Sequence, residues 1–275
     1  MRNGKPELEI LCAAMHQKDF SKLKEMNVHC DIFYANQAER EEYVELCFSD
    51  YKARMFTTTE RGVGKNRNLA LEHACGEILL FADEDMVYAE DARERVLQAF
   101  KQLPKADIII FGNHYARNGR IYKTRLPKTE KLHVYKAMRY GTYVIAVRNE
   151  SIKKAGIRFS ELFGGGSIYS LGEDTDFILQ CFRKGLKLYT YHYILGTTSK
   201  DVSTCFDGYN EKYFFDRGAF ARHAFPISAP AYLIYVSRKF GRYSDLSRRR
   251  RMQLLIAGYR SYPKKISYAM YQKNR

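Results

Sequence analysis

The residues best suited to chemistry in this sequence are acidic. Asp83-Glu84-Asp85 directly follows the apolar run EILLFA at residues 77–82. Residues i and i+2 of an extended chain face the same side, so Asp83 and Asp85 are predicted to project together. Two neighbouring carboxylates repel each other unless a cation lies between them, and hard oxygen ligands suit Mg²⁺ or Mn²⁺. The alternative is a solvated acidic turn that precedes the next helix.

A second group is a glycine-containing loop that leads into a helix. It reads RGVGKNRN at residues 61–68. A helix N-terminus with Lys65 and Arg67 beside it favours an anion such as a diphosphate. The spacing differs from that of a P-loop, so the loop alone does not identify a nucleotide site.

A third group opens a later helix. Glu173 and Asp174 follow Gly172, and a glycine run at residues 164–166 precedes them. A carboxylate beside a glycine loop is suited to act as a general base that deprotonates an acceptor hydroxyl. The alternative is that these acids only complement the helix dipole.

The elements that must position these groups alternate between strand and helix patterns, which predicts βαβ units and a doubly wound α/β sheet. Ligands of such sheets bind beyond the carboxyl ends of the strands, where the acidic group lies. The predicted strands are 8–15, 29–36, 51–59, 77–82, 107–113, 140–147 and 186–193. The predicted helices are 65–74, 89–102, 151–155 and 172–184, with a hairpin over 115–126 and a helical region after residue 198.

Charge is the extreme feature of the composition. The 275 residues carry a formal net charge of +15, of which residues 222–275 contribute +12 with Asp245 as their one acid. The near-neutral remainder argues against a basic nucleic-acid-binding fold. The six cysteines form no CxxC, which predicts buried reduced thiols without a disulfide framework. We see no secretory signal or membrane-spanning run and expect a cytoplasmic protein.

Taken in order, the motifs resemble family 2 of the inverting nucleotide-sugar glycosyltransferases, and small bacterial members in particular. The resemblance covers residues 8–218 and implies the GT-A fold, a Rossmann-like, mostly parallel sheet flanked by helices. The motifs are LEILCAAM (8–15), GVGKNRNLAL (62–71), ADEDM (82–86), FGGGS (163–167) and GEDTDF (172–177).

The resemblance implies a role for each matching residue. Asp83 would lie near the donor ribose and the metal, Asp85 would bind the metal directly, and the metal would be Mn²⁺ or Mg²⁺. Asp174 would be the catalytic base, with Glu173 supporting it. The residues implied to bind the nucleotide sugar are Ala14, Met15, His16, Lys65, Arg67, Asp83, Glu84, Gly165 and Gly166.

The sequence departs from the family pattern at a histidine that often completes the metal shell. Ser199 or Lys200 stands where that histidine is expected, ahead of the stretch STCF at 203–206. His192 lies earlier and is interpreted as a strand residue. Metal ligation would then rely on Asp85, diphosphate and water.

The basic C-terminal region is predicted to be a helical attachment. We expect a glycosyltransferase domain over residues 1–221 and a Tyr/Arg-rich tail over 222–275. Arg248–Arg251 and the surrounding tyrosines suit the headgroup layer of an anionic membrane, on its inner face. A solvated basic helix and a nucleic-acid surface are the alternatives.

The sequence therefore predicts a metal-dependent, inverting glycosyltransferase. The expected donor is a nucleotide sugar, with UDP as its nucleotide, and the expected acceptor is a hydroxyl of a glycan or of a lipid-linked cell-envelope molecule. The alternatives are a nucleotidyltransferase acting on a sugar phosphate and a non-catalytic basic adaptor that binds membrane or nucleic acid.

Overall fold

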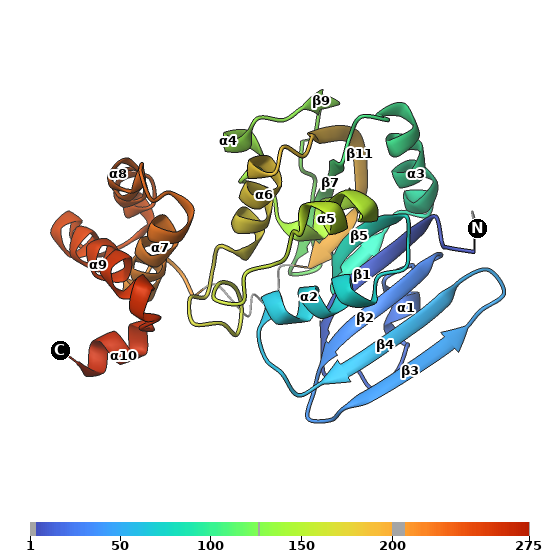
Figure 1. Ribbon diagram of the computed structural model, residues 1–275, viewed down its shortest axis with the longest axis horizontal. Helices are drawn as coiled ribbons and strands as arrows, with labels where there is room; N and C mark the ends of the chain where they lie inside the picture. Colours follow the sequence, from blue (N-terminus) through green and yellow to red (C-terminus); the bar gives the residue numbers. More distant parts are fainter. Residues whose placement is uncertain (1–3, 126, 200–206, 275) are drawn as a thin grey trace. The chain divides into compact units, whose positions relative to one another are not determined.

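The computed structural model describes residues 4–125, 127–199 and 207–274 (Figure 1). Lys200 and residues 203–206, singled out by the sequence, lie outside this range. The chain forms two compact units, and each is described by itself. The first comprises Met1–Arg61, Lys65–Phe159 and Phe177–Val202, and the second comprises Gly62–Gly64, Ser160–Asp176 and Ser203–Arg275.

The described residues form strands, α-helices and short 3-10 helices, labelled as in Figure 1. The strands are β1 (Leu8–Met15), β2 (Asp31–Gln37), β3 (Glu42–Cys47), β4 (Lys52–Thr58), β5 (Ile78–Asp83), β6 (Met86–Tyr88), β7 (Ile108–Arg117), β8 (Arg120–Tyr122), β9 (Glu130–Lys131), β10 (Ile145–Arg148) and β11 (Leu188–Ser199). The α-helices are α1 (Lys22–Glu25), α2 (Val63–His73), α3 (Ala92–Gln102), α4 (Val134–Ala137), α5 (Asn149–Ala155), α6 (Glu173–Arg183), α7 (Glu211–Ala224), α8 (Ala229–Lys239), α9 (Arg248–Ser261) and α10 (Tyr268–Lys273). The 3-10 helices are η1 (Thr142–Val144), η2 (Gly241–Tyr243) and η3 (Tyr262–Lys264).

The first unit is built on one mixed sheet of 11 strands, in the order β3-β4-β2-β1-β5-β10-β7-β11-β6, with β8 on β7 and β9 on β11. Strands β4, β2, β1 and β5 are parallel neighbours, and β10 lies antiparallel between β5 and β7. The predicted fold class, an α/β fold with helices flanking a central sheet, is confirmed, and the parallel pairing is found among the central strands β4, β2, β1 and β5 and between β7 and β11.

The two faces of the sheet are both covered, which explains the nearly continuous apolar runs of its central strands. Phe33 of β2 and Phe81 of β5 both pair in register with Leu11 of β1, so their side chains lie on the same face of the sheet. On that face His73 of α2 stacks on Phe33 at 5.1 Å between ring centroids, and Phe177 of α6 packs on Phe81 at 5.4 Å. The opposite face carries Tyr34, whose hydroxyl contacts Met26 beside α1 and whose ring contacts Phe20.

The structure departs from the sequence-based expectation in a few elements. Strand β3 was not predicted, because all six of its residues are exposed at the sheet edge and show no apolar alternation. The strand predicted over 140–147 is limited to β10, preceded by the 3-10 turn η1. The predicted hairpin forms as β7 and β8 around Asn118-Gly119, both at positive φ. Among the described cysteines, Cys47 and Cys75 are exposed rather than buried.

The second unit holds the C-terminal helices around a small apolar core. Helices α7 and α9 pack closely, since a Cβ at Gly218 would meet the carbonyl oxygen of Leu255 at 2.0 Å and one at Gly258 would meet that of Phe215 at 1.8 Å. No helix in the described ranges is long and apolar enough to span a bilayer. The buried core members are Tyr213, Phe214, Ala221, Ala229, Leu233, Val236, Leu254 and Leu255.

Candidate donor and acceptor sites

The acidic group lies at the carboxyl edge of the sheet, as predicted. Asp83 ends β5 and pairs in register with Ala13 near the end of β1. The turn through Glu84 and Asp85 then leads into β6. Ala14, Met15 and the acidic turn are therefore brought to one place by two neighbouring parallel strands.

Arg67 of α2 is held against this edge. Its Nη2 lies 3.0 Å from Oδ1 of Asp83, and its side chain is only 6% exposed. The guanidinium also lies over the ring of Phe159, 5.4 Å from the centroid. An ion pair with one buried partner fixes the orientation of the other, so Arg67 orients the Asp83 carboxylate.

Asp85 differs from Asp83 in its electrostatic surroundings. It makes no ion pair with a described residue. Partial desolvation and the charge of Asp83 raise its pKa to about 6, with a smaller contribution from Glu84. Beneath the turn, burial and the same three carboxylates raise the pKa of the Cys12 thiol. This edge therefore carries a negative potential that a bound cation would relieve.

The chemistry of the donor set fits a hard divalent cation. Across the described parts of the chain, no cluster of three or more His, Cys, Asp or Glu side chains surrounds a metal-sized space. The protein would supply Asp85 with Asp83, while diphosphate and water fill the other positions. That division is typical of Mg²⁺ sites, which usually combine one or two carboxylates with substrate phosphates.

Glu84 connects the acidic turn to the loop after β1. Its Oε2 accepts hydrogen bonds from the Met15 backbone N–H at 3.1 Å and from Nε2 of Gln17 at 2.6 Å. His16 between them adopts a positive φ of 56°. Glu84 thus shapes the loop that the resemblance assigns to the nucleotide base. Gln17 was not predicted, since its contact spans 67 positions of sequence.

The start of α2 approaches the same loop through Asn66. Its buried Nδ2 donates to the carbonyl oxygen of Ala14 at 3.2 Å, and its Oδ1 is buried without a hydrogen-bond partner among the described residues. Lys65 instead forms an exposed ion pair with Glu60, at 3.1 Å. Asn66 was not singled out from the sequence, because its burial and its contact with Ala14 depend on the tertiary fold.

The glycine loop and the acidic helix start belong to the second unit. The N–H of Val63 donates to the carbonyl oxygen of Gly165 at 2.9 Å, which ties the loop to the segment 62–64. Gly164 has a φ of 104°, and a Cβ there would lie 2.9 Å from Cδ of Glu173. The structure therefore brings the predicted loop and Glu173 into direct contact.

The first turn of α6 is anchored by a chain of polar contacts. Asp176 is buried, and its Oδ1 lies 2.8 Å from Nε2 of His223 in α7. The other ring nitrogen of His223 lies 2.7 Å from the Tyr262 hydroxyl. Asp174, half-buried, is carried on this anchored turn. The Asp176–His223 contact was not predicted, because nothing local in either segment indicates it.

His192 is confirmed as a strand residue. It lies in β11, exposed, with Nδ1 2.8 Å from the carbonyl oxygen of Pro127. Of the positions where a metal-binding histidine was expected, Ser199 ends β11, and Lys200 and residues 203–206 lie outside the described residues.

Comparison with known proteins bears on the family and the fold. Residues 32–162 match the model of "Glycosyl transferase family 2". No curated protein gives a significant sequence match. The structure of residues 1–349 of S. aureus TarS with UDP-GlcNAc matches with a TM-score of 0.56 at 14% identity, over 94% of this chain and 72% of that one.

A structure of a longer TarS chain matches in the same way. The S. aureus TarS structure gives a TM-score of 0.54 at 12% identity, over 96% of this chain and 44% of that chain. At such identities the likeness concerns the fold. The family resemblance and the GT-A fold are thus confirmed.

Proposed function

From the family 2 glycosyltransferase match over residues 32–162, we propose that this chain is a metal-dependent, inverting glycosyltransferase that uses a nucleotide sugar. The observation that carries the proposal is the carboxyl edge itself. There Arg67 holds Asp83, while Asp85 has no ion-pair partner among the described residues and a raised pKa. Such an edge favours a cation and, with it, a diphosphate.

The donor would lie along the residues that converge on this edge. Ala14 and Met15 at the end of β1, with His16 after them, would contact the nucleotide base, in a segment shaped by Glu84. Asp83, kept in one orientation by Arg67, would accept hydrogen bonds from the ribose. Mn²⁺ or Mg²⁺ held by Asp85 and Asp83 would neutralise the diphosphate and make it a better leaving group.

The transfer step would use Asp174 as the general base. Its carboxylate would take the proton from an acceptor hydroxyl, whose oxygen forms a new bond to the anomeric carbon of the sugar. The bond from that carbon to the diphosphate oxygen breaks on the opposite side, so the configuration inverts. The resemblance assigns Gly165 and Gly166 to the donor sugar and acceptor and Glu173 to a supporting role, and the anchored turn of α6 would hold Asp174 in place.

The expected acceptor is a hydroxyl of a glycan or of a lipid-linked cell-envelope molecule. UDP is the expected nucleotide, and UDP-GlcNAc is the first donor to test because the fold neighbour TarS has been solved with it.

A thermal-shift series with UDP, GDP and CDP, each with and without Mn²⁺, tests the proposal. We expect one nucleoside diphosphate to raise the melting temperature only when Mn²⁺ is present. The Asp50→Asn variant should behave as wild type, since Asp50 is exposed in the turn between β3 and β4. Absence of any nucleotide effect would contradict the proposal and favour the adaptor alternative.

The Asp174→Asn variant tests the base separately. It should bind UDP with wild-type affinity and lose transfer by about 10²- to 10⁴-fold, the usual contribution of a general base. Asp245→Asn, an exposed change in the same unit, is the matched control. Retained transfer by Asp174→Asn would place the base elsewhere.

A further inference from the structure

Exposed cations of the basic C-terminal region that pair with no carboxylate of the described residues lie on several of its helices, and the arginine run that dominates the sequence supplies only some of them. Half of the arginine run at 248–251 is used internally. Arg250 forms a bidentate ion pair with Glu211, at 2.6 and 2.8 Å, and Arg251 donates to the carbonyl oxygen of Leu246. The exposed members of the run, Arg248 and Arg249, stand at the first turn of α9.

Most tyrosines of the region are likewise committed within the second unit. The Tyr268 hydroxyl donates to Glu211, the Tyr232 hydroxyl accepts from Arg217, and the Tyr259 hydroxyl accepts from Arg222. Tyrosine side chains held this way are not free to enter a lipid headgroup layer. The arginine run and its tyrosines therefore make a weaker membrane surface than the sequence suggests.

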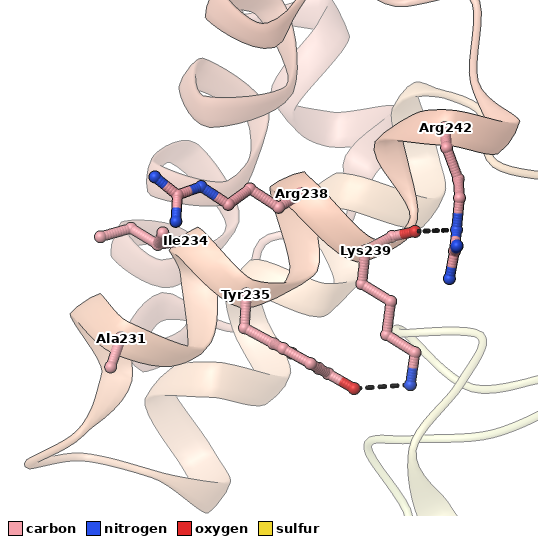
Figure 2. Close-up of a pocket in the computed structure, with 6 residues that line it drawn as sticks. All are labelled: Ala231, Ile234, Tyr235, Arg238, Lys239 and Arg242. Carbon is pink, nitrogen blue, oxygen red and sulfur yellow. Dashed lines mark hydrogen bonds between the residues drawn. The ribbon is translucent and has the colours of Figure 1, made fainter.

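Helix α8 and its flanks present a different surface (Figure 2). We define the α8 face as Ile227, Ala231, Ile234, Tyr235, Arg238, Lys239 and Arg242. Helical spacing places the members between Ala231 and Lys239 on one side of α8, with Ile227 in the turn before the helix and Arg242 in η2 after it. On the other side of α8, Leu233 and Val236 are buried in the core of the unit. All but Ile227 line one open pocket of about 580 Å³.

The α8 face is apolar toward its start and basic toward its end. Ile227 is 96% exposed and Ile234 is 44% exposed. Arg238, Lys239 and Arg242 are exposed, and none pairs with a carboxylate of the described residues. No Asp or Glu occurs anywhere in residues 217–244. The two isoleucines are therefore exposed to water beside cations that have no carboxylate partner among the described residues.

We propose that the α8 face binds the headgroup layer of an anionic membrane. The isoleucines would enter the boundary of the acyl chains, and the three cations would lie among the phosphates. An 11-residue helix is about 16 Å long, which allows one end to insert while the other stays at the headgroups. This proposal depends on the proposed function only for the purpose of membrane binding, which would be to hold the enzyme where a lipid-linked acceptor lies.

The contacts favour lipid over nucleic acid. A phosphodiester backbone offers no apolar partner for Ile227 or Ile234. Base stacking would need a free aromatic face, but the ammonium of Lys239 lies 5.1 Å from the Tyr235 ring centroid and 2.5 Å from its hydroxyl. Figure 2 shows this pair side by side, and it shows the hydrogen bond that Nε of Arg242 donates to the backbone carbonyl oxygen of Lys239.

Sedimentation of the full chain with vesicles tests the proposal. The test variant is R238Q/K239Q/R242Q, and the charge-matched control is R248Q/R249Q/R260Q, which removes three exposed cations from α9. Wild type should bind mixed phosphatidylglycerol–phosphatidylcholine vesicles but not pure phosphatidylcholine. The α8 variant should lose binding on the order of 100-fold, and the control by less than about threefold. I227S/I234S should weaken the binding that remains at high salt.

Three results would overturn the proposal: no binding to anionic vesicles, equal losses in the two triple variants, or wild-type binding by I227S/I234S. Preferential binding of single-stranded RNA through the α8 cations would instead indicate a polyanion surface. Hydrolysis of nucleotide sugars, measured in parallel, should be unchanged in the α8 variant. A failure of membrane binding can thus be distinguished from a failure of the proposed enzymatic function.

Discussion

The guanidinium of Arg67 and the carboxylate of Asp83 lie 3.0 Å apart, and their ion pair joins helix α2 to the end of the central strand β5. The arginine is buried and the aspartate is 37% exposed at its side chain. Arg67 therefore leaves Asp83 accessible to a ligand while fixing how it faces that ligand. Asp85, two residues on, has no such partner among the described residues.

Replacing Arg67 by Met should destabilise the protein and weaken donor binding. The substitution leaves the Asp83 charge without its buried partner. We expect the free energy of unfolding to fall by about 1–3 kcal/mol, which is less than for a fully buried ion pair because Asp83 reaches solvent. Urea unfolding measures this loss. Arg158→Met removes an exposed pair with Glu72 and should cost less than about 1 kcal/mol. Equal losses would show that the Arg67 pair has no special role.

Asp85→Asn should change how metal-free stability depends on pH. The pKa of Asp85 is raised to about 6 from an ordinary 3.8. Between these values the folded state binds more protons than the unfolded state, so this group's contribution to stability falls as pH rises through the window. The variant lacks that contribution. Its melting temperature should decline less than that of wild type between pH 4 and 6, and parallel profiles would contradict the assignment.

Gly164→Ala should disturb the loop beside Glu173. A Cβ would lie 2.5 Å from Cγ1 of Val63 and 2.9 Å from Cδ of Glu173, at a φ of 104°. We expect transfer to fall at least tenfold, because Glu173 must move. Gly185→Ala is the control, with a φ of 77° and nothing within 4 Å, so it carries only backbone strain of about 1 kcal/mol. A Gly164→Ala enzyme as active as the control would exclude the loop from the site.

His223→Phe should loosen the first turn of α6. It takes away the 2.8 Å contact with Asp176, whose side chain is 1% exposed, and such a loss costs on the order of 2–4 kcal/mol. Thermal unfolding measures the stability, and transfer activity measures the effect on Asp174. His192→Phe, at an exposed strand position, should change stability by less than about 1 kcal/mol. An unchanged melting temperature in His223→Phe would mean that Asp176 does not depend on this histidine.

Local patterns predicted the central strands and the acidic turn because burial on both faces leaves long apolar runs such as that of β5. They missed β3, whose exposed residues carry no such signal. The predicted Asp83 and Arg67 do meet, but the sequence could not show that they pair or that Glu84 binds Met15 and Gln17. Contacts between distant segments, such as Asp176 with His223, depend on tertiary packing that no local pattern encodes.

The most direct test of the account is hydrolysis of UDP-GlcNAc and other nucleotide sugars as Mn²⁺ is added, because slow donor hydrolysis needs no acceptor. We predict that wild type and Asp50→Asn hydrolyse one donor in a Mn²⁺-dependent manner and that Asp85→Ala loses this dependence together with the activity. Full Mn²⁺-dependent hydrolysis by Asp85→Ala would contradict the central claim that the carboxyl edge of this sheet binds the metal and the nucleotide sugar.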